Sequence, residues 1–346
     1  MATRTQSAEP SPAGADVDTP PAGRGTGLRG RVAHAMQPWR AANRMARGFV
    51  VTGVIITLVF VAMAVFADSI APYGEDQYRI QTGVDEDGEP QFGDEQIPRR
   101  AAPSTAHPFG TTSARFDVLS RIVYGARIAF SVIVLSTVVA MGVGVPLGLF
   151  SGYHGGRVDR VLVFLTDAVY AFPPLILAII FAAVLQQYMS PGVPTAAIAV
   201  GVTYIPQYFR VIRNHTLSVK EETFVEAARS LGAPPTTIIT RYVLYNVIQS
   251  VPVIFTLNAA DGVLTLAALG FLGIGIDYPA AEWGLDVARA VSDVVSGFWW
   301  TAFFPGMAIT TLVVGLTLVG EGLNDIVNPL LRTQAFQGSV EAKDGA

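Results

Sequence analysis

The stretch IAFSVIVLSTVVAMGVGVPLGLF, Ile128–Phe150, holds 23 consecutive residues without a charged side chain. An α-helix rises about 1.5 Å per residue, so roughly 20 apolar residues cross the ~30 Å hydrocarbon core of a bilayer. A second stretch, Phe49–Ala67, is also free of charge over 19 residues. Both stretches therefore predict transmembrane helices, and the chain is expected to be an integral membrane protein.

Composition agrees with this prediction, since 51% of the 346 residues are hydrophobic and only 14% are charged. The absence of cysteine excludes disulfides, thiolate metal sites and a cysteine nucleophile. Residues 1–48 are rich in Ala, Pro, Gly and Arg and lack apolar periodicity, which indicates a disordered tail. This tail is longer than the basic region of a signal peptide, so we expect the first span to remain uncleaved.

Four further apolar segments bring the expected number of spans to six. The sequence thus predicts an all-α membrane protein with six transmembrane helices. Its expected parts are a tail at 1–48, a first helix at 49–71, an extracytoplasmic loop at 72–126, a five-helix core at 127–325 and a second tail at 326–346. Within the core, the later spans are expected at 161–185, 195–209, 247–276 and 302–319.

The arginines indicate the orientation of the spans. They are frequent in the N-terminal tail, after the second span and after the fourth, whereas the intervening loops are neutral or acidic. Cytoplasmic loops carry an excess of Lys and Arg. Both termini are therefore expected to be cytoplasmic.

The largest cytoplasmic loop, expected at 213–246, contains two short helices separated by a break. Apolar residues spaced i, i+3, i+4 and i+7 form one stripe, and Gly232 suits the position just after the first helix. A narrow stripe of small apolar residues suits insertion into a partner's groove. From the residues alone, packing beneath the chain's own bundle is an equal alternative, and a DNA-binding helix-turn-helix is a weaker one. The stripe consists of Phe224, Ala227, Ala228 and Leu231, with Glu226 beside it.

This loop resembles the EAA loop of binding-protein-dependent ABC importer permeases through Glu226-Ala-Ala and Gly232. The resemblance extends over about residues 45–332 and is strongest to the C-type subunit of dipeptide, oligopeptide and nickel importers. Motifs that carry it include Ala71-Pro72-Tyr73, His107-Pro-Phe-Gly, Asp117-Val-Leu-Ser-Arg121, Gly152-Tyr-x-Gly-Gly-x-x-Asp159, Phe271-Leu-Gly-x-Gly275 and Trp283-Gly284.

The family resemblance implies a type I ABC importer permease whose cytoplasmic loop forms a coupling helix. It assigns Phe224, Glu226, Ala227, Ala228, Leu231 and Gly232 to contact with a separate ATPase. The implied partners are a second homologous permease subunit, two ATP-binding cassette subunits and an extracytoplasmic solute-binding protein. ATP and Mg²⁺ would be bound by the ATPases and no cofactor by this chain, which lacks a phosphate-binding Gly-x4-Gly-Lys motif.

The chain departs from the family pattern at several positions. Tyr245 stands where the family usually has proline, so the second loop helix is expected to run into the fifth span without the usual kink. Leu266 replaces a usual Glu and Gly270 a usual Ser. The family resemblance implies that the chain forms half of a translocation pathway for di- or oligopeptides, with nickel or another small solute of the same family as the alternative cargo.

Two carboxylates lie inside predicted spans, Asp167 and Asp261. A carboxylate at the centre of a span costs about 2.5–3.5 kcal/mol on insertion scales. Structural hydrogen bonding and pathway lining are both open for each. We expect Pro173-Pro174 to break or kink the third span, and the series Gly144, Gly148 and Gly152 to mark close helix contact.

The acidic loop at 72–113 is open to two interpretations, a solvated insertion and a lobe that meets the binding protein. The four histidines show no spacing typical of paired ligands, so no metal site is expected. A secondary transporter is the runner-up from a different class; it would require inverted repeats, which the sequence does not show.

Overall fold

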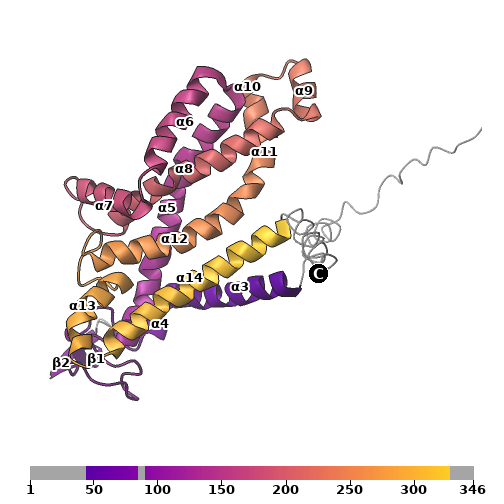
Figure 1. Cartoon of the computed structure of the whole chain (residues 1–346). Helices are drawn as coiled ribbons and strands as arrows, with labels where there is room; N and C mark the ends of the chain where they lie inside the picture. The colour runs from indigo at the N-terminus through magenta and orange to yellow at the C-terminus, as the bar shows by residue number, and fades with distance from the viewer. Residues whose placement is uncertain (1–43, 85–89, 328–346) are drawn as a thin grey trace, which may run out of the picture. The chain divides into compact units, whose positions relative to one another are not determined.

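The computed structural model describes residues 44–84 and 90–327, and these are mostly helical. The expected tails therefore fall largely outside the described residues, and so does the acidic cluster at 85–89. Figure 1 shows the elements in order. They are α3 (Arg44–Val65), α4 (Ala67–Ile70), β1 (Arg79–Val84), β2 (Pro90–Gln96), α5 (Val118–His154), α6 (Gly156–Tyr170), α7 (Pro174–Leu185), α8 (Val193–Val219), α9 (Thr223–Ser230), α10 (Pro235–Thr237), η1 (Ile238–Val243), α11 (Leu244–Val247), η2 (Ile248–Ser250), α12 (Val251–Phe271), α13 (Trp283–Val295) and α14 (Trp300–Val327).

Four helical stretches in the described part are long and apolar enough to cross a membrane. The number rises to five if one bent pair of helices is counted as a single span. The expected fourth span, 195–209, lies within α8 but is not among them. The membrane-spanning helical character is confirmed, whereas the count of six stays a prediction. The four stretches are Met45–Val65, Val118–His154, Pro235–Phe271 and Trp300–Asn324.

The third expected span is broken at its two prolines. Helix α6 ends at Tyr170, α7 begins at Pro174, and the two are bent by 93°. Pro173 has an extended backbone, with ψ of 128°, because a residue that precedes proline is disfavoured in the helical region. Pro174 then serves as the first residue of α7, where its missing N–H is no loss.

Three boundaries differ from those expected. Helix α3 begins at Arg44, so the last five residues assigned to the tail are helical. Helix α5 begins at Val118 rather than 127, because Asp117 caps it by accepting a hydrogen bond from Ser120 N. The expected loop also contains the antiparallel hairpin β1–β2. The absence of proline at Tyr245 agrees with an unbroken helical run over Pro235–Phe271, although it includes a π-helical turn in η1 and a 3₁₀ turn in η2.

Glycines on α5 allow it to pack closely along α8. A Cβ added at Gly144, Gly148 or Gly152 would come within 2.8 Å of α8 atoms, including the carbonyl oxygens of Ile205, Phe209 and Arg213. Gly201 of α8 makes the reciprocal approach to Ser136 O. The prediction of close helix contact is confirmed, and this seam holds α8 along α5.

Gly148→Ala is expected to lower stability by about 1–3 kcal/mol, because the new methyl would lie 2.7 Å from Phe209 O and the helices would have to separate. Gly142→Ala, on the same helix, is the control, since no atom lies within 4 Å of an added Cβ there. Thermal unfolding in detergent measures both. Equal melting temperatures for the two variants would contradict the close α5–α8 seam.

Candidate functional site

A cavity of about 540 Å³ lies where α8 and α12 face the end of α6. Its apolar side chains come mostly from α12, and polar side chains reach it from α8, α12 and α14. The lining residues are Tyr170, Gln207, Arg210, Val211, Ile254, Leu257, Asn258, Ala260, Asp261 and Thr317. This combination of an apolar wall and a few convergent polar groups is typical of a small-molecule site.

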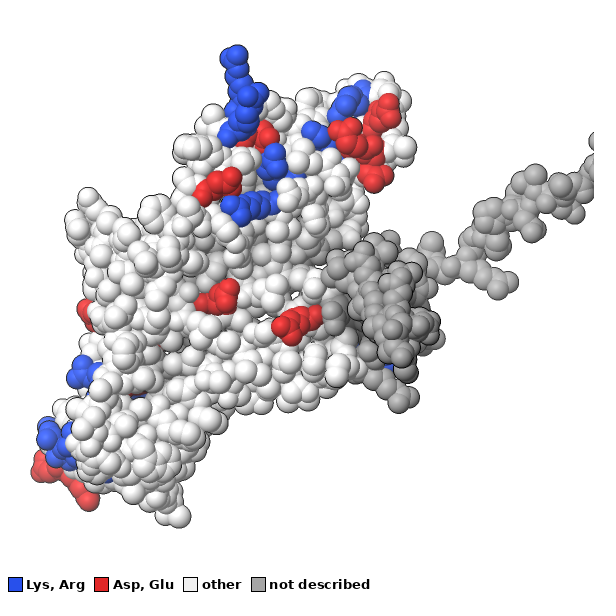
Figure 2. Space-filling view, in the orientation of Figure 1, with Lys and Arg blue, Asp and Glu red and all other residues white. Residues whose placement is uncertain are grey.

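Asp261 lies at the middle of α12 and faces this cavity. Its carboxylate forms none of the ion pairs found in the described part of the chain. Burial in lipid would be costly, so a water-filled cavity is the environment that a carboxylate at this depth needs. Figure 2 shows that charged side chains gather at the two ends of the visible face, with only isolated acidic groups on the broad uncharged zone between them.

Asp167 does not line the cavity itself. Its Oδ1 accepts a hydrogen bond of 2.7 Å from Nη2 of Arg210, and the Arg210 guanidinium lies 3.9 Å from the centre of the Tyr170 ring. Both Arg210 and Tyr170 line the cavity. The structure therefore places Asp167 in an ion pair at the edge of the cavity and Asp261 in its wall.

Asn258 was not identified from sequence. It is 7% exposed, lines the cavity one helical turn before Asp261, and lies beside the Tyr208 hydroxyl. Neither Nδ2 of Asn258 nor that hydroxyl makes a hydrogen bond of good geometry within residues 44–84 and 90–327. A neutral amide inside an apolar run gives little signal in sequence, and only the cavity distinguishes it.

The first loop helix, α9, ends in a tight left-handed turn. Gly232 has φ of +80°, its N–H donates to Arg229 O, and the N–H of Ala233 donates to Ala228 O. This is the Schellman arrangement, which satisfies the last carbonyls of a helix and favours glycine. The position expected for Gly232 is confirmed. Helix α10 then begins at Pro235.

The apolar stripe of α9 is divided between two faces, which corrects the expectation of a single docking surface. Ala228 is buried together with Val225 against the chain's own core, as the alternative of packing beneath the bundle predicts. Phe224 and Leu231 are 39% and 88% exposed, and Ala227 and Glu226 are also exposed. Glu226 forms no ion pair with Arg229 among those of the described residues. We call Phe224, Ala227 and Leu231 the outer face of α9; Figure 1 shows the helix at one end of the described elements.

A buried ion pair on the opposite side of the predicted membrane was also missed. Arg121 is 1% exposed, and its Nε donates to both carboxylate oxygens of Asp286 at 2.8 and 2.9 Å. Its remaining nitrogens donate to backbone oxygens of Glu75, Pro279 and Ala280. One guanidinium thus joins the start of α5, the segment after α4, the 279–280 loop and α13.

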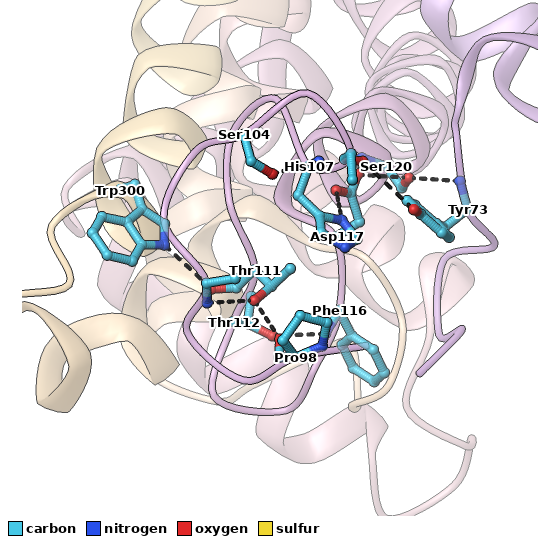
Figure 3. Close-up of polar contacts among 12 residues, drawn as sticks. Tyr73, Pro98, Ser104, His107, Thr111, Thr112, Phe116, Asp117, Ser120 and Trp300 are labelled. Atoms are coloured by element: carbon cyan, nitrogen blue, oxygen red, sulfur yellow. Dashed lines mark hydrogen bonds and ion pairs between the residues drawn. The ribbon is translucent and has the colours of Figure 1, made fainter. Parts of the chain in front are cut away.

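A second polar cluster surrounds Asp117 (Figure 3). One carboxylate oxygen lies 2.9 Å from Nδ1 of His107, while the other accepts from both N–H and Oγ of Ser120. Tyr73 stacks on His107 and its N–H donates to Ser120 Oγ. Ser, His and Asp meet here, but the serine and the histidine both bond to the aspartate. The serine hydroxyl therefore has no histidine base, and the cluster caps α5 rather than forming a nucleophile.

Glu282 caps α13 by accepting hydrogen bonds from the N–H groups of Gly284 and Leu285. The Glu282 carboxyl occupies the space that a Cβ at position 270 would need. Gly270, which has no Cβ, leaves this space free. Burial raises the pKa of Glu282 from 4.5 to about 7, although the two N–H donors oppose the shift.

This raised pKa predicts a pH-dependent stability. The folded protein binds the Glu282 proton more tightly than the unfolded chain, so the stabilisation is fully present below about pH 4.5 and is lost as the pH rises through about 7. Its size is about 3 kcal/mol at most. We expect Glu282→Gln, which can still accept a hydrogen bond, to reduce the slope of melting temperature against pH between pH 5 and pH 8. An unchanged slope would assign the pH dependence to another group.

Comparison with known proteins places these features among transport proteins. A family described as "Binding-protein-dependent transport system inner membrane component" matches residues 144–333. The glutathione transport system permease protein GsiD of Pectobacterium atrosepticum is 33% identical over 298 residues, 86% of this chain and 92% of the relative. GsiD of Escherichia coli O6:K15:H31 is 33% identical over 294 residues, 85% and 90% of the two chains. A solved structure of the MetNI methionine ABC transporter in inward-facing conformations covers 60% of this chain and 96% of its own, with 19% identity and a TM-score of 0.49.

Proposed function

Because this chain belongs to the family of binding-protein-dependent transport system inner membrane components, we propose that it forms half of the membrane pathway of an ATP-driven importer of small peptides. The family resemblance found in the sequence is confirmed. The chain is a multi-pass inner-membrane permease subunit, and permease subunits of this family are not themselves enzymes. The observation that carries this conclusion is 33% identity to permeases over 86% of the chain.

The proposed cargo is a small peptide. The relatives are named as glutathione permeases, and glutathione is a tripeptide. The cavity beside Arg210 and Asp261 has a volume that suits a short peptide. No observation favours the nickel or secondary-transporter alternatives over this one.

We further propose six crossings with both termini in the cytoplasm. Four apolar stretches and the α6–α7 pair supply five, and α8, held along α5 by the glycine seam, supplies the sixth. The chain contains no cysteine, so single-cysteine variants can be labelled without a background. Cysteine at Ser230 is expected to react with an impermeant maleimide only after the membrane is permeabilised, and cysteine at Gln77 from outside intact cells. The reverse labelling pattern would refute the orientation.

The outer face of α9 is proposed to dock into a separate ATPase, which binds ATP and Mg²⁺. Support comes from exposed apolar groups at Phe224 and Leu231 on a helix fixed from behind by Val225 and Ala228. Two ATPase subunits, a second permease subunit and an extracytoplasmic solute-binding protein complete the proposed assembly. Glu226, Ala227 and Gly232 belong to the same contact in this proposal, whereas Ala228 supports it from inside.

The pathway is proposed to run past the cavity wall that holds Asp261, with Asp167 orienting Arg210 at its edge. The proposed function is tested by purifying the tagged chain together with its co-encoded neighbours. We expect an ATPase to copurify and its hydrolysis to be stimulated by the loaded binding protein. Recovery of the chain without any ATPase would count against the proposal.

A further inference from the structure

The cavity presents opposite charges that are only partly satisfied by the protein. On α12, the Asp261 carboxylate has no ion-pair partner in the described part of the chain. Such a group can accept a cationic ligand without first breaking an internal contact. A primary ammonium group matches it in charge and in hydrogen-bonding capacity.

Arg210, which lines the same cavity, has donors that no contact uses within the described residues. A guanidinium carries five N–H donors. Only Nη2 of Arg210 is engaged within the described residues, by Oδ1 of Asp167. The Tyr170 ring beneath it fixes the plane of the guanidinium. A held guanidinium with free N–H groups is the usual recognition element for a carboxylate.

Asn258 also belongs to this wall, but its Nδ2 is buried beside the Tyr208 hydroxyl rather than open to the cavity. The two charged side chains, Asp261 and Arg210, therefore carry the inference.

We propose that this cavity is a binding site for a zwitterionic small peptide: Asp261 contacts its ammonium group and Arg210 its carboxylate. The inference rests on the proposed function, because it names the cargo chemistry of the same pathway. A divalent metal ion fits less well, since a guanidinium in the same cavity repels it while a single carboxylate attracts it.

The test uses the permease complex purified with its ATPases but without the solute-binding protein. Any discrimination between the peptides must then come from the permease. Binding of radiolabelled alanyl-alanine is measured by scintillation proximity. Unlabelled alanyl-alanine, N-acetyl-alanyl-alanine, which lacks the ammonium, and alanyl-alanine amide, which lacks the carboxylate, serve as competitors. We expect the wild type to prefer the unmodified dipeptide over each derivative by about tenfold, the worth of one charged hydrogen bond.

The variants separate the two contacts. Asp261→Asn is expected to lose discrimination against the N-acetyl derivative alone, and Arg210→Gln against the amide alone. Glu321→Gln, an exposed acid of α14 outside the cavity lining, is the matched control and should keep both preferences. Each variant must retain the elution volume and the subunit composition of the wild-type complex.

Failure of this inference is distinguishable from failure of the proposed function. Equal competition by all three compounds in the wild type, no specific binding at all, or preferences that survive in Asp261→Asn and Arg210→Gln would overturn the peptide site. The function would still stand if the complete transporter imported the dipeptide into proteoliposomes with ATP. A complete transporter that imports nothing would refute the function itself.

Discussion

Leu231→Glu is expected to abolish ATP-driven uptake while leaving the permease folded. Leu231 is 88% exposed at the end of α9, so its replacement removes no internal packing. On the outer face of α9, however, a new carboxylate would have to be desolvated in the apolar groove of the ATPase. Central apolar contacts of an interface are worth about 2 kcal/mol or more, which corresponds to roughly 30-fold weaker association.

Two measurements check this result, the ratio of ATPase to permease after affinity purification and the rate of peptide uptake. Asn214→Glu is the control, because it adds the same charge at an exposed position of α8, outside the loop helix. We expect the control to retain both copurification and uptake. Normal copurification in Leu231→Glu would show that the outer face of α9 does not dock to the ATPase.

Arg121→Leu is expected to destabilise the protein by about 3–5 kcal/mol, because it leaves the Asp286 carboxylate buried without its partner. The arginine also satisfies three backbone oxygens, which would lose their donor. Thermal unfolding in detergent measures the loss. Arg127→Gln, two turns further along α5, removes the exposed pair with Asp68 and the hydrogen bond from Arg127 Nε to Ala64 O, and it should cost much less stability than Arg121→Leu.

The double variant Arg121→Leu with Asp286→Leu separates the charge from the packing. Removing both charges relieves the unpaired carboxylate, so the double variant should recover part of the stability lost in Arg121→Leu. If Asp286→Leu costs as much stability in the Arg121→Leu background as it does alone, the two side chains act independently. The ion pair would then not explain the loss.

Local patterns in the sequence predicted the features that depend on neighbours in the chain. The long apolar runs located α3 and α5, because crossing a bilayer needs about 20 apolar residues in succession. Pro173 and Pro174 located the break in the third span, but the 93° angle depends on what α7 packs against and could not be predicted.

Features that depend on distant contacts were not predictable in the same way. Arg121 and Asp286 are 165 residues apart, and neither has a local pattern that indicates burial. In α9 the periodicity of the apolar residues was correct, but it could not show that Ala228 faces the chain's own bundle while Leu231 faces outward. The carboxylate of Asp261 was found because charge is costly inside a span, whereas the neutral amide of Asn258 gave no comparable signal.

The account is tested most directly by uptake of radiolabelled alanyl-alanine into proteoliposomes that contain the purified permease, its ATPases and the solute-binding protein. We predict accumulation that requires ATP on the side of the liposome where α9 lies, and that stops when the ATPase subunits or the binding protein are omitted. Accumulation without ATP, driven by an ion gradient and independent of the ATPase subunits, would contradict the account.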